Sequence, residues 1–133
     1  MGNSQLYTGF GDKGYTQTVK NKRVHKSDSL IEVIGTIDEY SASLGLAKVQ
    51  SGDEDLKDTI EKLQKKLISV MGELAGAEVS VGNECVKVVE ALTDKYMPTG
   101  HFEFTICGGN IVSAQLDVAR TIIRRAERRA SLL

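Results

Sequence analysis

The chain has 133 residues, of which 41% are hydrophobic and 26% are charged, a size and balance typical of one domain with a modest core. Its formal net charge of −1 excludes the overall basic field of a nucleic-acid-binding protein, and no apolar run approaches the roughly 20 residues that a membrane helix needs. Two separated cysteines and two isolated histidines argue against a structural metal site. The N-terminus lacks a charged segment followed by an apolar one, so we expect no signal peptide and a cytoplasmic protein.

Residues 6–18 are rich in glycine and are expected to form a loop. Gly9, Gly11 and Gly14 allow positive φ angles and close approach of the backbone to a ligand. Such a loop can cradle a phosphate with its amides, although an exposed turn explains the same residues. Residues 19–28 are expected to be a polar, basic connector, in which Lys26 is either an anion contact or a solvated lysine.

A first long helix is expected to start at residue 29. Asp28 or Ser29 can cap it, and Glu32 would complete a capping box with Ser29. Asp38 and Glu39 fall within the helix among apolar neighbours. A carboxylate buried at such a position needs a cationic partner, which an arginine-rich helix later in the chain could supply.

Two further helices follow. Asp53 can cap a second helix whose leucines and isoleucines recur every three or four residues to about residue 77. Its opposite face is rich in lysine and glutamate, so we expect a scaffold helix. Residues 83–96 carry the same spacing over a shorter length, and the segment from Met97 to His101 ends that third helix.

Phe104 belongs to a stretch, 102–106, in which apolar and polar residues alternate, as in a short extended segment. By spacing alone Phe104 is predicted to be a core residue, and the alternative is one wall of a pocket for a flat ligand. The sharp turn 107–110, which ends in Asn110, can cap a fourth helix that runs from residue 111 to about residue 131.

The fourth helix carries five arginines within ten residues. Arg120, Arg124 and Arg128 are spaced four apart, so they share one side of a helix. Val118, Ile122 and Ala126 form an apolar row beside them. The arginines are either a solvated basic face near a helix C-terminus, where the dipole favours cations, or a binding surface for an anion. Long helices with short connections predict an all-α, antiparallel bundle of four main helices, with one domain over residues 1–133: the loop and connector in 1–28, the bundle in 29–133.

Three separated motifs resemble those of one enzyme family. Residues 7–14 (YTGFGDKG) are similar to the TKxGDxG loop of the PduO-type ATP:cob(I)alamin adenosyltransferases, and 35–45 (GTIDEYSASLG) to that family's GxxDEL helix. Residues 104–109 (FTICGG) and 119–128 (ARTIIRRAER) resemble its FILPGG and ARTxxRRAER blocks. The order and the spacing of the motifs also match.

The resemblance implies a homotrimer of helical bundles with active sites between neighbouring subunits. It implies transfer of the 5′-deoxyadenosyl group of ATP, accompanied by Mg²⁺, to the cobalt of cob(I)alamin. A corrinoid reductase or a cobalamin-dependent enzyme would be a partner, whereas nucleic acid and membranes would not. Catalytic roles would fall to Asp38, Arg120 and Arg124, with Asp38 and Arg120 paired between subunits, and Phe104 would lie under the corrin. The residues matched to ATP are Thr8, Gly11, Asp12, Gly14, Thr16, Gln17, Lys26, Arg124, Arg125, Glu127 and Arg128.

The sequence also departs from the family pattern. Gly9 occupies a position where relatives have lysine, Cys107 replaces a proline, Asp117 stands where histidine is frequent, and Tyr40 replaces a leucine. The family continues beyond the position of Leu133 into a further helix, without which apolar surface is expected to be exposed. Three hypotheses therefore stand: a working adenosyltransferase, a relative that binds nucleotide or corrinoid without turnover, and a structural bundle that serves as an oligomerisation partner.

Overall fold

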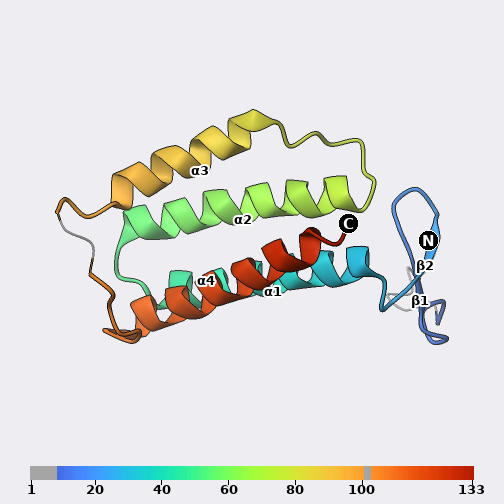
Figure 1. Ribbon diagram of the computed structural model, residues 1–133, viewed down its shortest axis with the longest axis horizontal. Coiled ribbons are helices and arrows are strands. Elements are labelled where there is room, and N and C mark those ends of the chain that lie inside the picture. Colours follow the sequence, from blue (N-terminus) through green and yellow to red (C-terminus); the bar gives the residue numbers. More distant parts are fainter. Residues whose placement is uncertain (1–8, 101–102) are drawn as a thin grey trace, which may run out of the picture.

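The computed structural model describes residues 9–100 and 103–133 (Figure 1). Four helices form the body of the molecule, and a two-stranded hairpin precedes them. The elements are β1 (Tyr15–Gln17), β2 (Arg23–His25), α1 (Ser29–Gln50), α2 (Glu54–Leu74), α3 (Asn83–Tyr96) and α4 (Ile111–Ala130). The predicted helical bundle is confirmed, with helix bounds close to those expected from the sequence.

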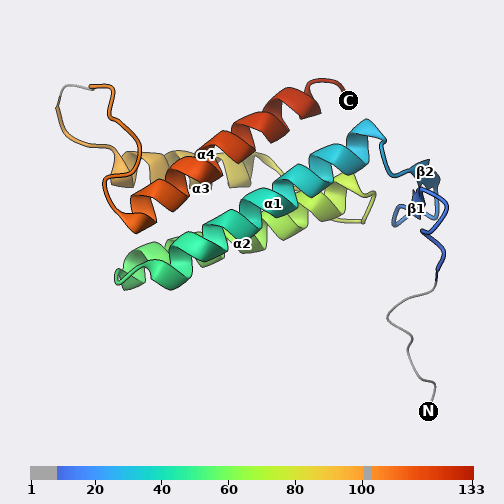
Figure 2. The ribbon, with the colours of Figure 1, turned by 90° about the horizontal axis from the view of Figure 1, so that it is seen from below.

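The core lies where α1 meets α4 and α2. Leu44, Ala47, Ile60 and Ala119 form one buried cluster. Val33, Ile37 and Ala126 form a second. Alanine has a small side chain, so the alanines of α1 and α4 let these helices approach closely, and the two lie side by side and antiparallel (Figures 1 and 2).

The predicted loop and connector contain a short hairpin that the sequence did not indicate, whereas residues 9–14 ahead of it form turns, as expected of a loop. Strands β1 and β2 pair antiparallel, with Thr16 opposite Val24, and Val24 is buried. The hairpin is tied to the bundle, because the Val19 amide donates to the Ala75 carbonyl at the end of α2 over 3.1 Å. Strands of three residues are too short to show a period of two in the sequence.

The caps of α1, α2 and α4 lie where the sequence predicts them, whereas the capping box predicted at α1 does not form. Asp53 accepts from two amides of the first turn of α2, and Asn110 forms a capping box with Ser113 at the start of α4. At α1 the cap is Asp28, which accepts from the Leu30 amide over 2.9 Å. The predicted capping box of Ser29 with Glu32 is wrong, because the Glu32 carboxylate pairs instead with Arg129 of α4.

The segment between α3 and α4 contains no strand in its described part, residues 97–100 and 103–110. Phe104 is fully exposed and Ile106 is nearly so. The prediction that Phe104 is a core residue is therefore wrong within this chain. Alternation over so few residues is not enough to specify a strand when no neighbouring strand is available to pair with it.

Helix α3 stands apart from the rest of the bundle (Figure 1), and none of its residues is buried. Between it and the other helices runs an open, mainly apolar groove of about 640 Å³, which we call the α3 groove. Tyr40 of α1, Leu56 and Ile60 of α2, Leu92 of α3 and Leu116 of α4 are among its lining residues. In the described part of the chain no helix is both long and apolar enough to cross a membrane.

Candidate functional site on the arginine helix

The arginines of α4 divide into two sets that point in different directions. Ala119, Ile122 and Ala126 are the buried residues of this helix, so its core face is fixed by them. Val118, which the sequence places in the apolar row, is instead about half exposed, and Ala119 takes its place.

Arg125 and Arg129 lie on the side of α4 that faces α1. Nη2 of Arg125 donates to Oε2 of Glu39. Nη1 of Arg129 lies 2.5 Å from Oε1 of Glu32 and donates to the Thr36 hydroxyl over 2.8 Å. An arginine of α4 thus pairs with a mid-helix carboxylate of α1, Glu39, although that carboxylate is exposed and not buried.

Arg120, Arg124 and Arg128 form the exposed set, which we call the arginine ladder. Within the described residues, Arg124 and Arg128 pair with no carboxylate, and Nη1 of Arg128 donates to the Arg124 carbonyl over 3.0 Å. The Glu127 side chain is exposed beside them. Two guanidinium groups are therefore available to an anionic ligand on this face.

Arg120 is placed differently from the other two. Its Nε lies 3.5 Å from Oδ1 of Asp117, and its Nη2 donates to Sγ of Cys107 over 3.8 Å. Asp38, its predicted partner between subunits, is exposed on α1. No ion pair joins Asp38 to any described residue of the same chain, so the pairing of Asp38 with Arg120 remains a prediction about an assembly.

The glycine-rich loop is folded against the start of the hairpin. The Asp12 amide donates to the Gly9 carbonyl, and the Lys26 amide donates to the Gly14 carbonyl over 2.8 Å. The Lys26 ammonium lies over Gly11, since a Cβ there would come within 3.0 Å of Nζ. The Lys26 ammonium thus lies beside the glycine-rich loop, where a cation can meet a phosphate.

Not every predicted loop residue points to an open site. The side-chain amide of Gln17 donates to Asn21 across the hairpin turn. Thr16 is half-buried opposite Val24. Thr8, also matched to ATP, lies outside the described residues.

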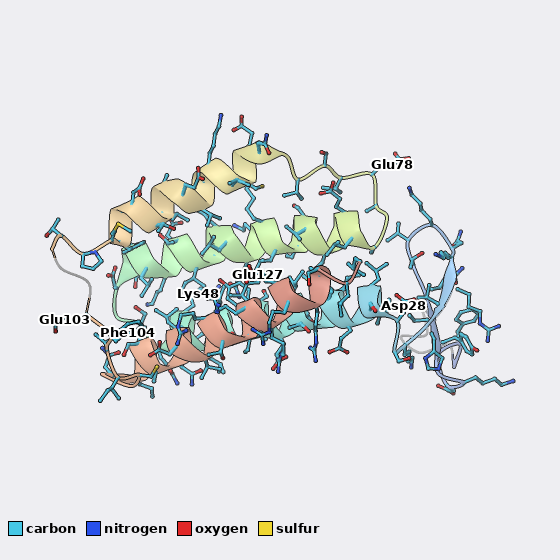
Figure 3. The ribbon with its side chains drawn as sticks, viewed as in Figure 1. Asp28, Lys48, Glu78, Glu103, Phe104 and Glu127 are labelled. Atoms are coloured by element: carbon cyan, nitrogen blue, oxygen red, sulfur yellow. The ribbon has the colours of Figure 1, made fainter. Side chains whose placement is uncertain are left out.

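The glycine-rich loop and Phe104, both predicted to belong to the site, lie at opposite ends of the helical bundle. The hairpin lies at the end of the bundle where α1 begins and α4 finishes, and Glu127 lies towards that end of α4 (Figures 1 and 3). Phe104 lies at the other end, beside the start of α4 (Figure 3). Because an α-helix of 20 residues is about 30 Å long, one chain does not bring all of these residues together.

The chemistry of the site follows from its donors. Guanidinium groups bind phosphate oxygens in pairs, and backbone amides with a lysine add further donors. These residues fit a polyphosphate. No three His, Cys, Asp or Glu side chains in residues 9–100 and 103–133 are placed to hold a metal ion.

The sequence profile of the cobalamin adenosyltransferase family matches residues 6–133. The chain belongs to this family. It is 35% identical to a corrinoid adenosyltransferase of Citrobacter freundii, over 93% of this chain and 76% of that protein. It is 36% identical to a corrinoid adenosyltransferase of Bacillus subtilis, over 97% of this chain and 72% of that protein. It is 32% identical to Corrinoid adenosyltransferase PduO of Salmonella typhimurium, of which it covers 40%.

Solved structures agree with this assignment. A variant of the PduO-type ATP:corrinoid adenosyltransferase of Lactobacillus reuteri, complexed with cobalamin and ATP, superposes with a TM-score of 0.88 at 27% identity. The match covers 96% of this chain and 75% of that one. A second variant, complexed with ATP, gives a TM-score of 0.85 at 28% identity.

For an adenosyltransferase of this family, Glu32 and Thr36 are the residues that sequence reasoning missed. They hold Arg129, whereas Glu32 was assigned to a capping box. The signal was present in the spacing, since Glu32, Thr36 and Glu39 lie on one face of α1. That face could not be matched to α4 without knowing how the two helices pack.

Proposed function

We propose that this protein transfers the 5′-deoxyadenosyl group of ATP to cob(I)alamin. In this reaction the reduced cobalt attacks C5′ of the ribose with its electron pair. A cobalt–carbon bond forms, the C5′–O5′ bond breaks, and triphosphate leaves with the electrons of that bond. The protein supplies no nucleophile, so its task is to position the two substrates and to stabilise the leaving group.

The arginine ladder is the observation that carries this proposal. Arg124 and Arg128 are exposed and have no carboxylate partner among the described residues, so they are free to bind the triphosphate that develops charge as it leaves. Lys26 over Gly11 supplies a second cationic point. Mg²⁺ bound to ATP would offset part of the remaining negative charge.

We further propose that the site is completed by neighbouring subunits of a homotrimer. The glycine-rich loop and Phe104 lie at opposite ends of the bundle (Figure 3), so an interface is needed to bring them to one pair of substrates. The outer face of α1 suits such an interface. Ala42, Leu46 and Val49 are exposed there at helical spacing, with Asp38 on the same face.

Phe104 would then lie against the corrin of the bound substrate, where an exposed phenyl ring keeps water from the lower face of the cobalt. Its exposure in the isolated chain fits a role in contact with a ligand.

A cytoplasmic location, where cysteines stay reduced, suits the free Cys85 and Cys107. A corrinoid reductase or a cobalamin-dependent enzyme would be the protein partner.

The alternative is a relative that binds nucleotide or corrinoid without turnover. Gly9 favours it, because relatives have a lysine at this position and the loop here lacks that charge. The two functions differ only in whether the cobalt–carbon bond forms.

The deciding experiment is an anaerobic assay with chemically reduced cobalamin and MgATP, which follows the loss of cob(I)alamin absorbance. Turnover is expected. Arg124→Ala should lower kcat/KM for MgATP by about a hundredfold, the effect of losing one or two charge-assisted hydrogen bonds. Lys87→Ala, which removes an exposed cation of α3, should leave it unchanged.

Calorimetry on the same sample separates the remaining outcomes. Saturable ATP binding without turnover would favour the binding relative. Neither binding nor turnover would contradict both functions and leave a structural bundle.

A further inference from the structure

We propose that Glu39 and Glu32 of α1 are positioning residues that set the rotation of α4 about its own axis and so aim the arginine ladder outward. On this view Arg125 is held by α1 and is not a ligand of ATP, although the family motif matches it to the nucleotide. The inference rests on the proposed function, because it assigns the ladder to the triphosphate.

Two glutamates of α1 face two arginines of α4. Glu32 and Glu39 are seven residues apart, two turns of α1, and Arg125 and Arg129 are one turn apart on α4. Because the helices are antiparallel (Figure 2), Glu39 meets Arg125 and Glu32 meets Arg129. Two charged contacts on the same side of α4 resist rotation in a way that one contact would not.

The fully buried part of α4 beneath these contacts is small. The buried residues of α4 are two alanines and Ile122. Val112, Leu116 and Ile123 of the same helix are half-buried against this core. Because apolar cores tolerate repacking when their volume is kept, this packing specifies the rotation less sharply than directional contacts do. Directional hydrogen bonds are better suited to specify it.

The contact of Arg129 involves two side chains of α1. Its Nη1 reaches both the Glu32 carboxylate and the hydroxyl of Thr36, and that hydroxyl donates to the Glu32 carbonyl over 2.7 Å. Thr36 is only 2% exposed. One guanidinium therefore bridges a carboxylate and a buried hydroxyl, which fixes its position more tightly than a single ion pair would.

The contact of Arg125 with Glu39 also determines the direction of Arg124. Consecutive residues of a helix are about 100° apart, so holding Arg125 against Glu39 turns Arg124 away from α1. Nη2 of Arg125 is engaged, and its Nε is buried with no hydrogen-bond partner among the described residues. To bind ATP, Arg125 would have to leave Glu39 with its charge unpaired.

A charge swap tests the idea directly. Glu39→Gln and Arg125→Glu, each alone, should raise KM for MgATP by about tenfold or more. The double variant Glu39→Arg with Arg125→Glu should restore most of the loss, because the pair is re-formed in the opposite sense. Were Arg125 an ATP ligand, the double variant would place a carboxylate on the triphosphate, and no rescue would follow.

Glu61→Gln is the matched control, since Glu61 is an exposed glutamate that pairs with Lys65 of α2 and Lys48 of α1 but with no arginine of α4, and it should leave KM unchanged. A second measurement needs no substrate. The Nε–H signal of Arg125 in NMR should exchange slowly with solvent, because the Nε is buried, and faster in Glu39→Gln.

The outcomes separate this inference from the proposed function. Absence of ATP binding by the unaltered protein would contradict the proposed function. The NMR exchange of the Arg125 Nε–H would still report on the contact between Glu39 and Arg125. Unaltered KM and exchange in Glu39→Gln, or failure of the swap to rescue, would overturn the positioning role.

Discussion

Gly9 lies in the left-handed region of the backbone, with φ at +68°. A side chain at this position is strained by roughly 1 kcal/mol, and its Cβ would lie 3.3 Å from Oδ2 of Asp12. The lysine that the family pattern has at this position would add a cation to the glycine-rich loop. The substitution therefore has two opposed effects, which can be measured separately.

Gly9→Lys is expected to tighten MgATP binding and to lower the melting temperature slightly. Gly9→Ala carries the same backbone strain without the charge, so it serves as the control. Titration calorimetry measures the affinity and thermal unfolding the stability. Equal ATP affinities for the lysine and alanine variants would show that the loop does not hold phosphate.

Asp55, at the start of α2, holds the end of α3. Its carboxylate accepts from the Lys95 ammonium over 2.5 Å and from the Tyr96 hydroxyl over 2.7 Å. The Tyr96 hydroxyl also lies 3.1 Å from Oγ1 of Thr59. Because α3 has no buried residue, this polar contact is a main attachment of the helix.

The attachment should depend on pH. Hydrogen bonds from Lys95 and then from Tyr96 hold the pKa of Asp55 below its usual value, so its contribution is present above the pKa of the unfolded state and is lost as the pH falls through the folded one. The hydrogen bond to Asp55 raises the pKa of Lys95, so that contribution is lost only at strongly alkaline pH. We expect α3 to loosen below about pH 4.

Asp55→Asn should have the same effect at neutral pH. Hydrogen–deuterium exchange of residues 83–96 is expected to accelerate, while exchange in α1 and α4 stays unchanged. Glu54→Gln, which affects only the pair between Glu54 and Lys57 within α2, is the control. If exchange in α3 is no faster in Asp55→Asn, another contact holds the helix.

The elements that sequence reasoning predicted are those specified by their own residues. Asp53 and Asn110 cap α2 and α4 where they were expected, because a cap needs only a side chain and the next turn. The hairpin was missed, since its position depends on the contact of Val19 with Ala75, far along the chain. Phe104 was misjudged because burial of a residue depends on what packs over it, and the described part of the chain places nothing there.

At the scale of the whole molecule, Asp38 and Arg120 are expected to pair across subunits. Arg120→Ala and Asp38→Ala should each weaken the proposed trimer and lower kcat by at least about tenfold, because each leaves the other charge without its partner. Light scattering coupled to gel filtration measures the mass, and the anaerobic assay measures turnover. Normal mass and turnover in either variant would place the pair elsewhere.

The candidate site was only partly predictable, because part of it depends on how the helices and subunits pack. The exposure of Arg124 and Arg128 follows from their spacing on α4, and sequence alone suggested it. The engagement of Arg125 by Glu39 and of Arg129 by Glu32 depends on the rotation of α4 against α1, which spacing within each helix does not specify. Whether Phe104 meets the glycine-rich loop depends on the proposed assembly, which the packing of one chain does not specify.

Two tyrosines line the α3 groove, Tyr40 and Tyr96, and Tyr40 can report on it optically. Burial raises the pKa of the Tyr40 phenol, which lines the groove, and the chain has four tyrosines and no tryptophan. In an alkaline titration followed by tyrosinate absorbance, Tyr40 should ionise above the usual pH of about 10. Anything that fills the groove would exclude water from this phenol and move its ionisation higher still, so the absorbance alone would tell when the groove is covered.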